Sequence, residues 1–168
     1  MTQRYEQKIQ ELSLLRRVLD VLRDCTELDE VFRRLLAIVQ EEWSTSACSL
    51  YLADDSGELV LRARCMADGP VEILRRRDPG ACRIPAGSGP LGETFASGQV
   101  MVVPFVSDET LGWFPADGRA LLTAPLGPGT ACMGVLALHA REVTEVSEDA
   151  TRLLPILANH ATLFDPIW

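Results

Sequence analysis

Hydrophobic residues in the first quarter of the chain recur at the spacing of a helix. Residues 5–24 place apolar side chains three and four positions apart, which predicts an amphipathic helix, and residues 26–43 repeat the pattern after a short break. Fewer than about three good heptads are marginal for an isolated pair of helices, so we expect the first helix to pack both on a second copy and within its own domain. Its a and d heptad positions hold Tyr5, Leu12, Leu15, Leu19 and Leu22, with Lys8 at one d position.

Alternation of apolar and polar residues follows and predicts strands. Residues 48–53 and 59–66 flank an Asp-Asp-Ser-Gly turn and form a predicted hairpin. The alternation in its second strand places Leu59, Leu61, Ala63 and Cys65 on one face. A brief strand at residues 100–103 ends at Pro104. Residues 120–126 and 131–138 form a second predicted hairpin across a Gly-Pro-Gly-Thr turn.

Glycine and proline mark the remaining elements. Residues 67–81 contain Gly-Pro and Pro-Gly turns and are predicted to be a loop with room for a short helical piece. A short helix is predicted from Pro90 to Ser97, followed later by an aromatic-rich loop at residues 105–118. A closing helix begins after the cap Ser147 and contains Pro155, where we expect a kink or a local break. This order predicts an α+β fold, an antiparallel sheet with helices gathered on one face.

The charge of the chain restricts its partners. Its 168 residues include 16 basic and 24 acidic side chains, a net charge of −8, which argues against nucleic acid or an anionic membrane as the main partner. The basic cluster Arg75–Arg77 is interpreted as a solvated loop, with binding of a phosphate or an acidic partner segment as the alternative. No apolar run approaches the ~20 residues that span a bilayer, and the polar N-terminus lacks a secretion signal, so a cytoplasmic location is expected.

Five cysteines are scattered along the sequence. No two of them form a CxxC pair, and no Cys/His cluster has the spacing of a zinc site. Such a set is typical of small buried hydrophobic residues, and redox sensing by one or two thiols is the alternative. The five are Cys25, Cys48, Cys65, Cys82 and Cys132.

Three stretches carry a family resemblance. Residues 84–98 are IPAGSGPLGETFASG, a glycine-rich turn that leads into a short helix. Two apolar strands contain TAPL at residues 123–126 and MGVLAL at residues 133–138. The sequence EVSED at residues 145–149 then leads into a helix with LLPILANHA at residues 153–161. In this order and spacing the chain resembles the GAF family, ligand- and signal-sensing modules, over roughly residues 28–164.

The resemblance implies a specific architecture. Its sheet has six antiparallel strands, with the N- and C-terminal helices on one face and a roof of loops and short helices on the other, here residues 67–81, 90–98 and 104–119. It also implies a signalling and dimerisation helix at residues 1–25, a GAF domain at residues 26–165 and a tail at residues 166–168. Family members bind small effectors beneath the roof, dimerise through the terminal helices and regulate an output such as a kinase, cyclase, phosphodiesterase or transcription factor. A homodimer with a small-molecule effector and such an output partner is therefore expected.

The sequence contains no complete binding motif for any of the family's known ligand classes. The cyclic-nucleotide set cannot be placed, and neither His139 nor His160 follows a cysteine as in bilin-binding relatives; both are interpreted as structural or interfacial rather than as haem ligands. The cofactor is left unknown and no metal site is expected. The aromatic loop either closes over an apolar or planar molecule or only plugs the gap over the sheet. The candidate ligand-binding residues are Arg64, Cys82, Phe105, Trp113, Phe114, Thr123 and Met133, and the candidate dimer residues are Leu12, Leu15, Leu19, Leu22 and Leu157.

A thiol-dependent enzyme is a distinct alternative. Free methionine-(R)-sulfoxide reductases are similar in fold, and Cys82 matches one of their cysteine positions. Their next cysteine falls on Leu91, and the one in the later loop falls near Ala116 and Asp117. Sulfoxide reduction needs a nucleophilic thiolate and a second thiol that resolves the sulfenic acid. We therefore expect a non-enzymatic sensory GAF domain in bacterial-type signal transduction, with this reductase and a ligand-free structural dimerisation module as alternatives.

Overall fold

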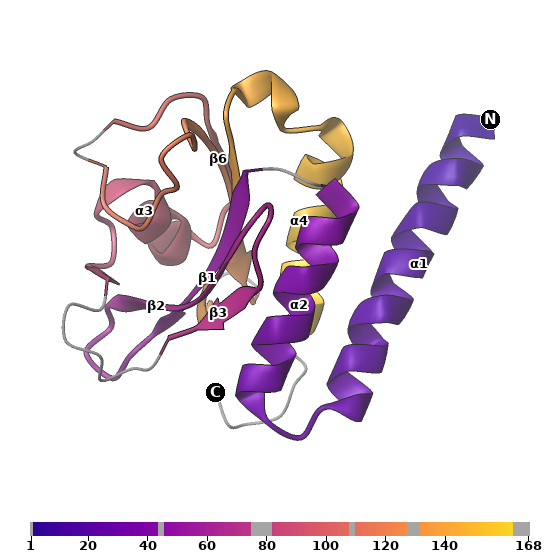
Figure 1. Ribbon diagram of the computed structural model, residues 1–168, viewed down its shortest axis with the longest axis horizontal. Coiled ribbons are helices and arrows are strands. Elements are labelled where there is room, and N and C mark those ends of the chain that lie inside the picture. The colour runs from indigo at the N-terminus through magenta and orange to yellow at the C-terminus, as the bar shows by residue number, and fades with distance from the viewer. Residues whose placement is uncertain (1, 44–45, 75–81, 108–109, 128–131, 163–168) are drawn as a thin grey trace.

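The computed structural model describes residues 2–43, 46–74, 82–107, 110–127 and 132–162 of the chain (Figure 1). The basic cluster at residues 75–77, the turn at residues 128–130 and the predicted tail at residues 166–168 lie outside the described residues. No helix among the described residues has both the length and the apolar content needed to cross a membrane.

Six antiparallel strands form the central sheet, in the order β3-β2-β1-β7-β6-β5. A seventh, two-residue strand, β4, pairs with β2 beside this path. The predicted α+β fold and six-stranded antiparallel sheet are therefore confirmed. The strands are β1 (Ala47–Ala53), β2 (Leu59–Met66), β3 (Val71–Ile73), β4 (Arg83–Ile84), β5 (Met101–Val103), β6 (Ala120–Leu126) and β7 (Gly134–Ala140).

Three strands differ from the sequence prediction by more than one residue, and one of them, β4, was not predicted at all. Strand β3 lies inside the predicted loop at residues 67–81, because three residues without alternation of their own gain hydrogen bonds from the edge of β2. Strand β7 begins at Gly134 and runs to Ala140 instead of covering residues 131–138. Met133 precedes the strand, and its N–H donates to the carbonyl of Leu126 at 2.7 Å, which closes the described end of the hairpin.

A bulge in β2 corrects the predicted faces of that strand. Leu50 pairs with Ala63 whereas the next residue, Tyr51, pairs with Leu61, so Arg62 is the extra residue. Leu59 and Leu61 consequently face one side of the sheet, while Ala63 and Cys65 pack on the other. Strict alternation had placed all four on one face. The bulge also turns Arg64 towards the side of Leu59 and Leu61.

Helices cover both faces of the sheet. On one face lie α2 (Leu28–Trp43) and α4 (Glu148–Ala161), and α1 (Thr2–Asp24) packs outside them as a further layer (Figure 1). On the other face lie α3 (Gly89–Ser97) and the loops that form the roof (Figure 1). Ser147 caps α4 by accepting a hydrogen bond from the N–H of Ala150, as predicted. The helix continues through Pro155 without the local break considered from the sequence.

Alternating strand residues produce two apolar cores. The larger core joins the sheet to the three outer helices, with Cys48, Leu50, Leu136 and Leu138 among its sheet residues. The smaller core lies beneath the roof. Its fully packed members are Tyr51, Leu59, Leu61, Ile84, Leu91, Val106, Leu121, Val135 and Ala137. Burial of apolar surface at about 25 cal/mol per Å² makes these two cores the main stabilising term of the fold.

Candidate functional site

Three polar side chains gather on the roof side of the two central strands. Ser49 and Tyr51 alternate along β1, and His139 lies on the neighbouring strand β7. The hydroxyl of Ser49 is 2.9 Å from Nε2 of His139, and both residues are completely buried. These three residues form the floor of the candidate site, which we call the roof-side cluster.

Aromatic residues of the roof loop cover this cluster. Trp113 and Phe114 meet the ring of His139 edge to face, with ring centroids 5.4 and 5.5 Å away. The backbone N–H of Trp113 donates a 2.8 Å hydrogen bond to the hydroxyl of Tyr51. The loop is thus attached to the sheet by a specific bond as well as by apolar contact.

Arg64 borders the cluster from β2. Its guanidinium lies 5.4 Å from the centroid of the Trp113 ring, within the range of a cation–π contact. Its Nε also donates to Glu72 on β3 at 2.5 Å. The arginine therefore connects the aromatic roof to the edge of the sheet and supplies a positive charge beside the cluster.

Burial keeps His139 neutral. The absence of solvent around the ring lowers its pKa from 6.5 to about 3. Nδ1 of this ring is buried and has no hydrogen-bond partner among the described residues. An unpaired buried polar atom costs about 1–3 kcal/mol, so a bound molecule or a water that paired with Nδ1 would be stabilised there.

The free energy of unfolding should decrease as the pH is lowered, because of His139. The unfolded chain binds a proton at this ring below pH 6.5 whereas the folded chain does so only near pH 3, so protons favour unfolding between these values. From pH 7.5 to pH 5 this linkage should lower the free energy of unfolding by about 2 kcal/mol. Urea unfolding of the wild type and His139→Gln at both pH values measures it. Equal pH dependence in the two proteins would contradict the assignment.

Cys82 lies at the margin of the cluster and packs against the roof-side core. Burial raises the pKa of its thiol, and a hydrogen bond with Tyr51 offsets only part of this effect. Burial also raises the pKa of Tyr51 well above its usual value. Both groups therefore stay protonated at neutral pH and act as hydrogen-bonding groups.

The space directly beneath the roof is occupied by side chains. Trp113, Phe114, Cys82 and Phe95 pack against the roof-side core. A pocket of about 310 Å³ lies within the roof loop, and it shares Phe114 and Gly118 with the surroundings of His139. Small-molecule sites begin at about 300 Å³, so this pocket is at the lower limit of that range.

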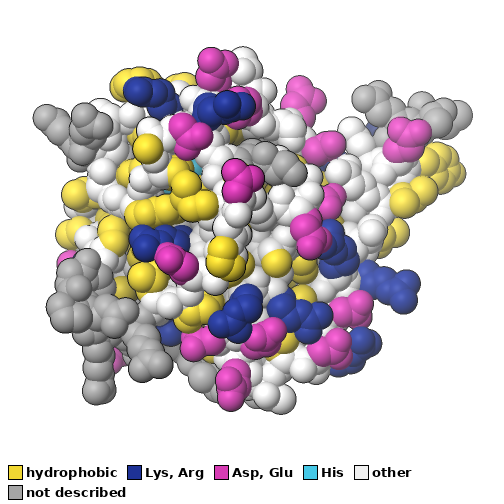
Figure 2. Space-filling model, viewed as in Figure 1, with side chains coloured by type: hydrophobic (Ala, Val, Ile, Leu, Met, Phe, Trp, Pro, Cys, Tyr) yellow, Lys and Arg dark blue, Asp and Glu magenta, His cyan; other side chains and the backbone are white. Residues whose placement is uncertain are grey.

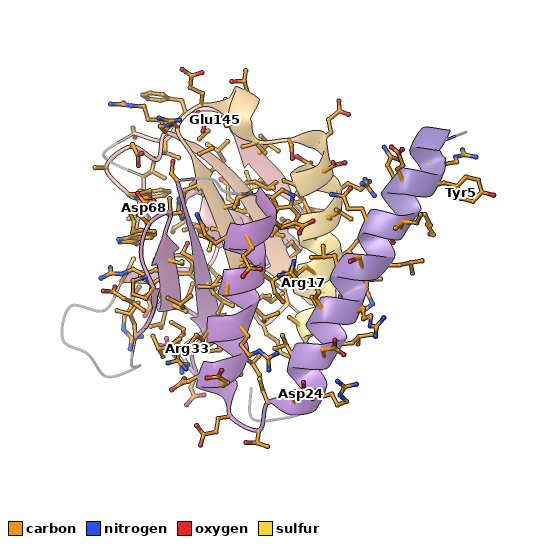
Figure 3. The ribbon with its side chains drawn as sticks, turned by 45° about the vertical axis from the view of Figure 1, so that its right-hand side comes forward. Tyr5, Arg17, Asp24, Arg33, Asp68 and Glu145 are labelled. Atoms are coloured by element: carbon orange, nitrogen blue, oxygen red, sulfur yellow. The ribbon has the colours of Figure 1, made fainter. Side chains whose placement is uncertain are left out.

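A second candidate surface is the outward face of α1. Leu14, Val18 and Val21 of this helix are buried against the domain. Arg17 on the same helix binds Glu41 and Glu42 at the end of α2, at 2.5 and 3.3 Å (Figure 3). The exposed apolar face of α1, which we call the α1 face, consists of Tyr5, Ile9, Leu12 and Leu19, exposed by 72, 64, 58 and 48%.

The α1 face projects from the body of the molecule. Apolar side chains are visible along the protruding N-terminal part of the helix in Figure 2, and Tyr5 points away from the domain in Figure 3. Leu15 and Leu22 are half-buried beside this face. Contiguous exposed apolar residues on a helix are typical of a contact surface for another protein.

Comparison with known proteins decides the family. A family model described as a GAF domain matches residues 25–164. The chain belongs to the GAF domain family. None of the curated proteins compared with this GAF domain matches it.

Solved structures of other proteins are similar to this GAF domain. The GAF domain of a phosphoenolpyruvate-protein phosphotransferase from Coxiella burnetii has a TM-score of 0.73 and 20% identity, covering 93% of this chain and 92% of that chain. Its counterpart from Acinetobacter has a TM-score of 0.70 and 19% identity, covering 92% of each chain. Free methionine-R-sulfoxide reductase from Neisseria meningitidis, in complex with its substrate, has a TM-score of 0.69 and 25% identity, covering 92% of this chain and 87% of that chain.

Four of the seven predicted ligand-binding residues of this GAF domain lie at the roof-side cluster. They are Arg64, Cys82, Trp113 and Phe114. Phe105 does not join them, because its side chain is 63% exposed and its neighbour Val106 takes the buried position.

Thr123 and Met133 are held elsewhere. The hydroxyl of Thr123 pairs with that of Thr94 at 2.6 Å and so fastens α3 to β6. Met133 lies six residues before His139 along the chain, about 20 Å away at the rise of a strand. The hydroxyl of Thr123 is therefore already engaged, and Met133 lies far from the His139 end of the cluster.

Sequence reasoning missed three residues of the GAF cluster. Ser49, Tyr51 and His139 were not among the candidates, and His139 was interpreted as structural or interfacial. The alternation of strand residues could have indicated them, because His139 shares its strand face with Val135 and Ala137. Which face of β1 and β7 pointed to the roof could not be decided from alternation, because both strands are apolar on both faces.

One predicted dimer residue is corrected by the structure. Leu157 is completely buried, since α4 turns it into the core between helices and sheet, so it offers no surface to a second copy of the GAF domain. Leu12, Leu15, Leu19 and Leu22 remain on or beside the α1 face. Among the residues that the structure describes, no group of three His, Cys, Asp or Glu side chains is placed to hold a metal ion.

Proposed function

We propose that the chain is a non-enzymatic sensory GAF domain that dimerises through the α1 face and responds to a small molecule at the roof-side cluster. The observation that carries the proposal is the α1 face, four apolar side chains about half or more exposed on a helix whose opposite face is buried in the domain. A second copy of the same helix would cover them. Exposed apolar side chains in this number are otherwise an aggregation hazard.

The chemistry of the cluster favours a small planar molecule with at least one polar group. Trp113 and Phe114 supply aromatic surface, and Arg64 supplies a positive charge beside it. Nδ1 of His139 offers an unused hydrogen-bonding position. Entry of a ligand requires the roof loop to move from its present packing, since side chains fill the space in this structure.

Central strands connect the cluster to the helices. Ser49 faces the roof while its neighbour Cys48 packs beneath α2, and His139 and Leu138 are related in the same way on β7. A displacement of these strands therefore reaches both sides of the sheet. A ligand shifts the helix arrangement only to the extent that it binds the two arrangements with different affinity.

Two measurements on the unmodified protein test the proposal. Sedimentation equilibrium should give twice the 18.5 kDa mass of one chain at micromolar concentration. A thermal-shift screen of nucleotides, amino acids and aromatic metabolites should find a compound that raises the melting temperature, since binding to the folded state alone stabilises it. A monomer would overturn the dimerising role. If a compound raises the melting temperature of Trp113→Ala as much as that of the wild type, its site lies away from the roof-side cluster.

A reductase is the second candidate, favoured by the likeness to the Neisseria meningitidis enzyme at 25% identity. The protonated, half-buried Cys82 thiol argues against it, because the thiolate is the nucleophile. We expect no turnover of free methionine-(R)-sulfoxide with dithiothreitol as reductant, measured by chromatography of the methionine formed. Turnover that disappears in Cys82→Ser and persists in the control Cys132→Ser would establish the enzyme instead.

A further inference from the structure

Two of the scattered cysteines face each other across neighbouring strands. Cys48 on β1 and Cys65 on β2 are direct partners in the antiparallel register. Directly opposed residues in such a ladder have Cα atoms about 4.5 or 5.5 Å apart, according to the type of pair. Both spacings fall within the 4.4–6.8 Å that a disulfide spans. The pair is therefore placed for a bond that needs no movement of the backbone.

The two side chains point to the same face of the sheet and interact. Both belong to the core between the sheet and the helices, where the bulge in β2 directs Cys65. The interaction between the two thiols lowers the pKa of Cys65 and, with burial, raises the pKa of Cys48.

Access differs between the two thiols. Cys48 is completely buried, and its sulfur lies 3.6 Å from the carbonyl oxygen of Leu36 on α2. Cys65 is 4% exposed at the end of β2, where residues 66–70 form an exposed turn. Its sulfur lies 3.5 Å from the carbonyl oxygen of Gly69 in that turn. A small oxidant therefore reaches Cys65 from the turn and meets Cys48 only behind it.

We propose that Cys48 and Cys65 form a reversible intramolecular disulfide when a hydroperoxide oxidises Cys65. The Cys65 thiolate attacks the hydroperoxide, its O–O bond breaks, and Cys65 becomes a sulfenic acid while the oxidant leaves as an alcohol, or as water when it is hydrogen peroxide. The Cys48 thiol then attacks the sulfenic sulfur, an S–S bond forms, and water is released. A dithiol reductant returns the disulfide to two thiols by thiol–disulfide exchange.

The disulfide would alter a contact beneath α2. Its formation removes the S–H of Cys48, so that the hydrogen bond to the carbonyl of Leu36 is lost. The carbonyl belongs to the helix that packs between the sheet and α1 (Figure 1). Oxidation is thus a second input to the helices, on the face of the sheet opposite to the roof-side cluster, and it stands or falls independently of ligand binding.

Tryptic peptide mapping tests the proposal on the whole chain. Trypsin places Cys48 in the peptide of residues 35–62 and Cys65 in the peptide of residues 65–75, each with a single cysteine. After a brief treatment with hydrogen peroxide at pH 7.5 and alkylation, we expect these peptides joined, two hydrogens lighter than their sum. Dithiothreitol should separate them.

Variants assign the two roles. In Cys48→Ala the joined peptides should be absent, and the dimedone-trapped sulfenic acid on Cys65 should increase about 10-fold because no thiol resolves it. In Cys65→Ser, Cys48 should stay reduced, whereas the control Cys132→Ser should keep the joined peptides. Wild-type protein in which Cys65 stays reduced, passes directly to sulfinic acid or bonds to another cysteine overturns the proposal, whether or not the variants fold.

Discussion

Leu12→Glu/Leu19→Glu should convert the proposed dimer into a monomer with an intact fold. Both side chains lie on the α1 face, exposed by 58 and 48%, and each leucine buried in an interface contributes about 1.5–3 kcal/mol. Four such leucines meet in a symmetric dimer, and the substitutions also bring four like charges together. Since 1.4 kcal/mol is about tenfold in affinity, the dissociation constant should rise by at least about 100-fold.

The matched control carries the same change of charge elsewhere. Val102 and Phe105 are exposed by 43 and 63% on and just after the edge strand β5, outside the α1 face, so Val102→Glu/Phe105→Glu should leave the proposed dimer unchanged. Glutamate is a good helix former, and circular dichroism should show that neither variant loses helix. Sedimentation equilibrium across a concentration series gives the constants. A dimer that survives in the leucine variant, or that dissociates equally in both, would show that the α1 face is not the interface.

Gly134→Ala should destabilise the fold by more than about 3 kcal/mol, beyond the usual range for an inserted methylene. Gly134 opposes Leu52 where β7 lies against β1, and a Cβ at this position would meet the carbonyl oxygen of Tyr51 at 2.1 Å. Because that oxygen belongs to the backbone, no rotamer change relieves the contact. Separation of the two central strands would weaken the Ser49–His139 pair and both cores.

Gly69→Ala is the control for this substitution. A Cβ there would meet only Cβ of Met66 at an ordinary 3.8 Å, so the free energy of unfolding should change by less than about 0.5 kcal/mol. Urea unfolding with a shared slope compares both variants with the wild type. If Gly134→Ala unfolds within 1 kcal/mol of the wild type by this measure, roughly the average for a point mutation, the strands can separate and the close approach is not essential.

Local patterns predicted most of the architecture. Helical spacing identified α1 and α2, turn chemistry identified both hairpins, and the bounds of β2 and β6 were predicted to the residue. These elements carry strong periodic signals of their own. Strand β3 carries none, since its three residues become a strand only by pairing with β2, and the predicted loop contained it unrecognised.

The candidate site was predicted only in part for a related reason. Aromatic composition singled out Trp113 and Phe114 in the roof loop, and the structure places both against His139. Phe105 has the same composition signal, yet it lies exposed because loop geometry depends on what the loop packs against. His139 was set aside since a histidine at the end of an apolar strand gives no sign of its neighbours.

By itself the sequence determined the order of the helices and of the strands other than β3 and β4, the GAF motifs and the existence of an apolar seam on the first helix. Periodicity and turn residues are local properties, and they survive without knowledge of the fold. Tertiary structure alone decided that Leu157 is core and that the α1 face is the open side of its helix. It also decided that Cys48 opposes Cys65, because one bulge in β2 reverses the faces beyond Arg62, and a bulge depends on the partner strand.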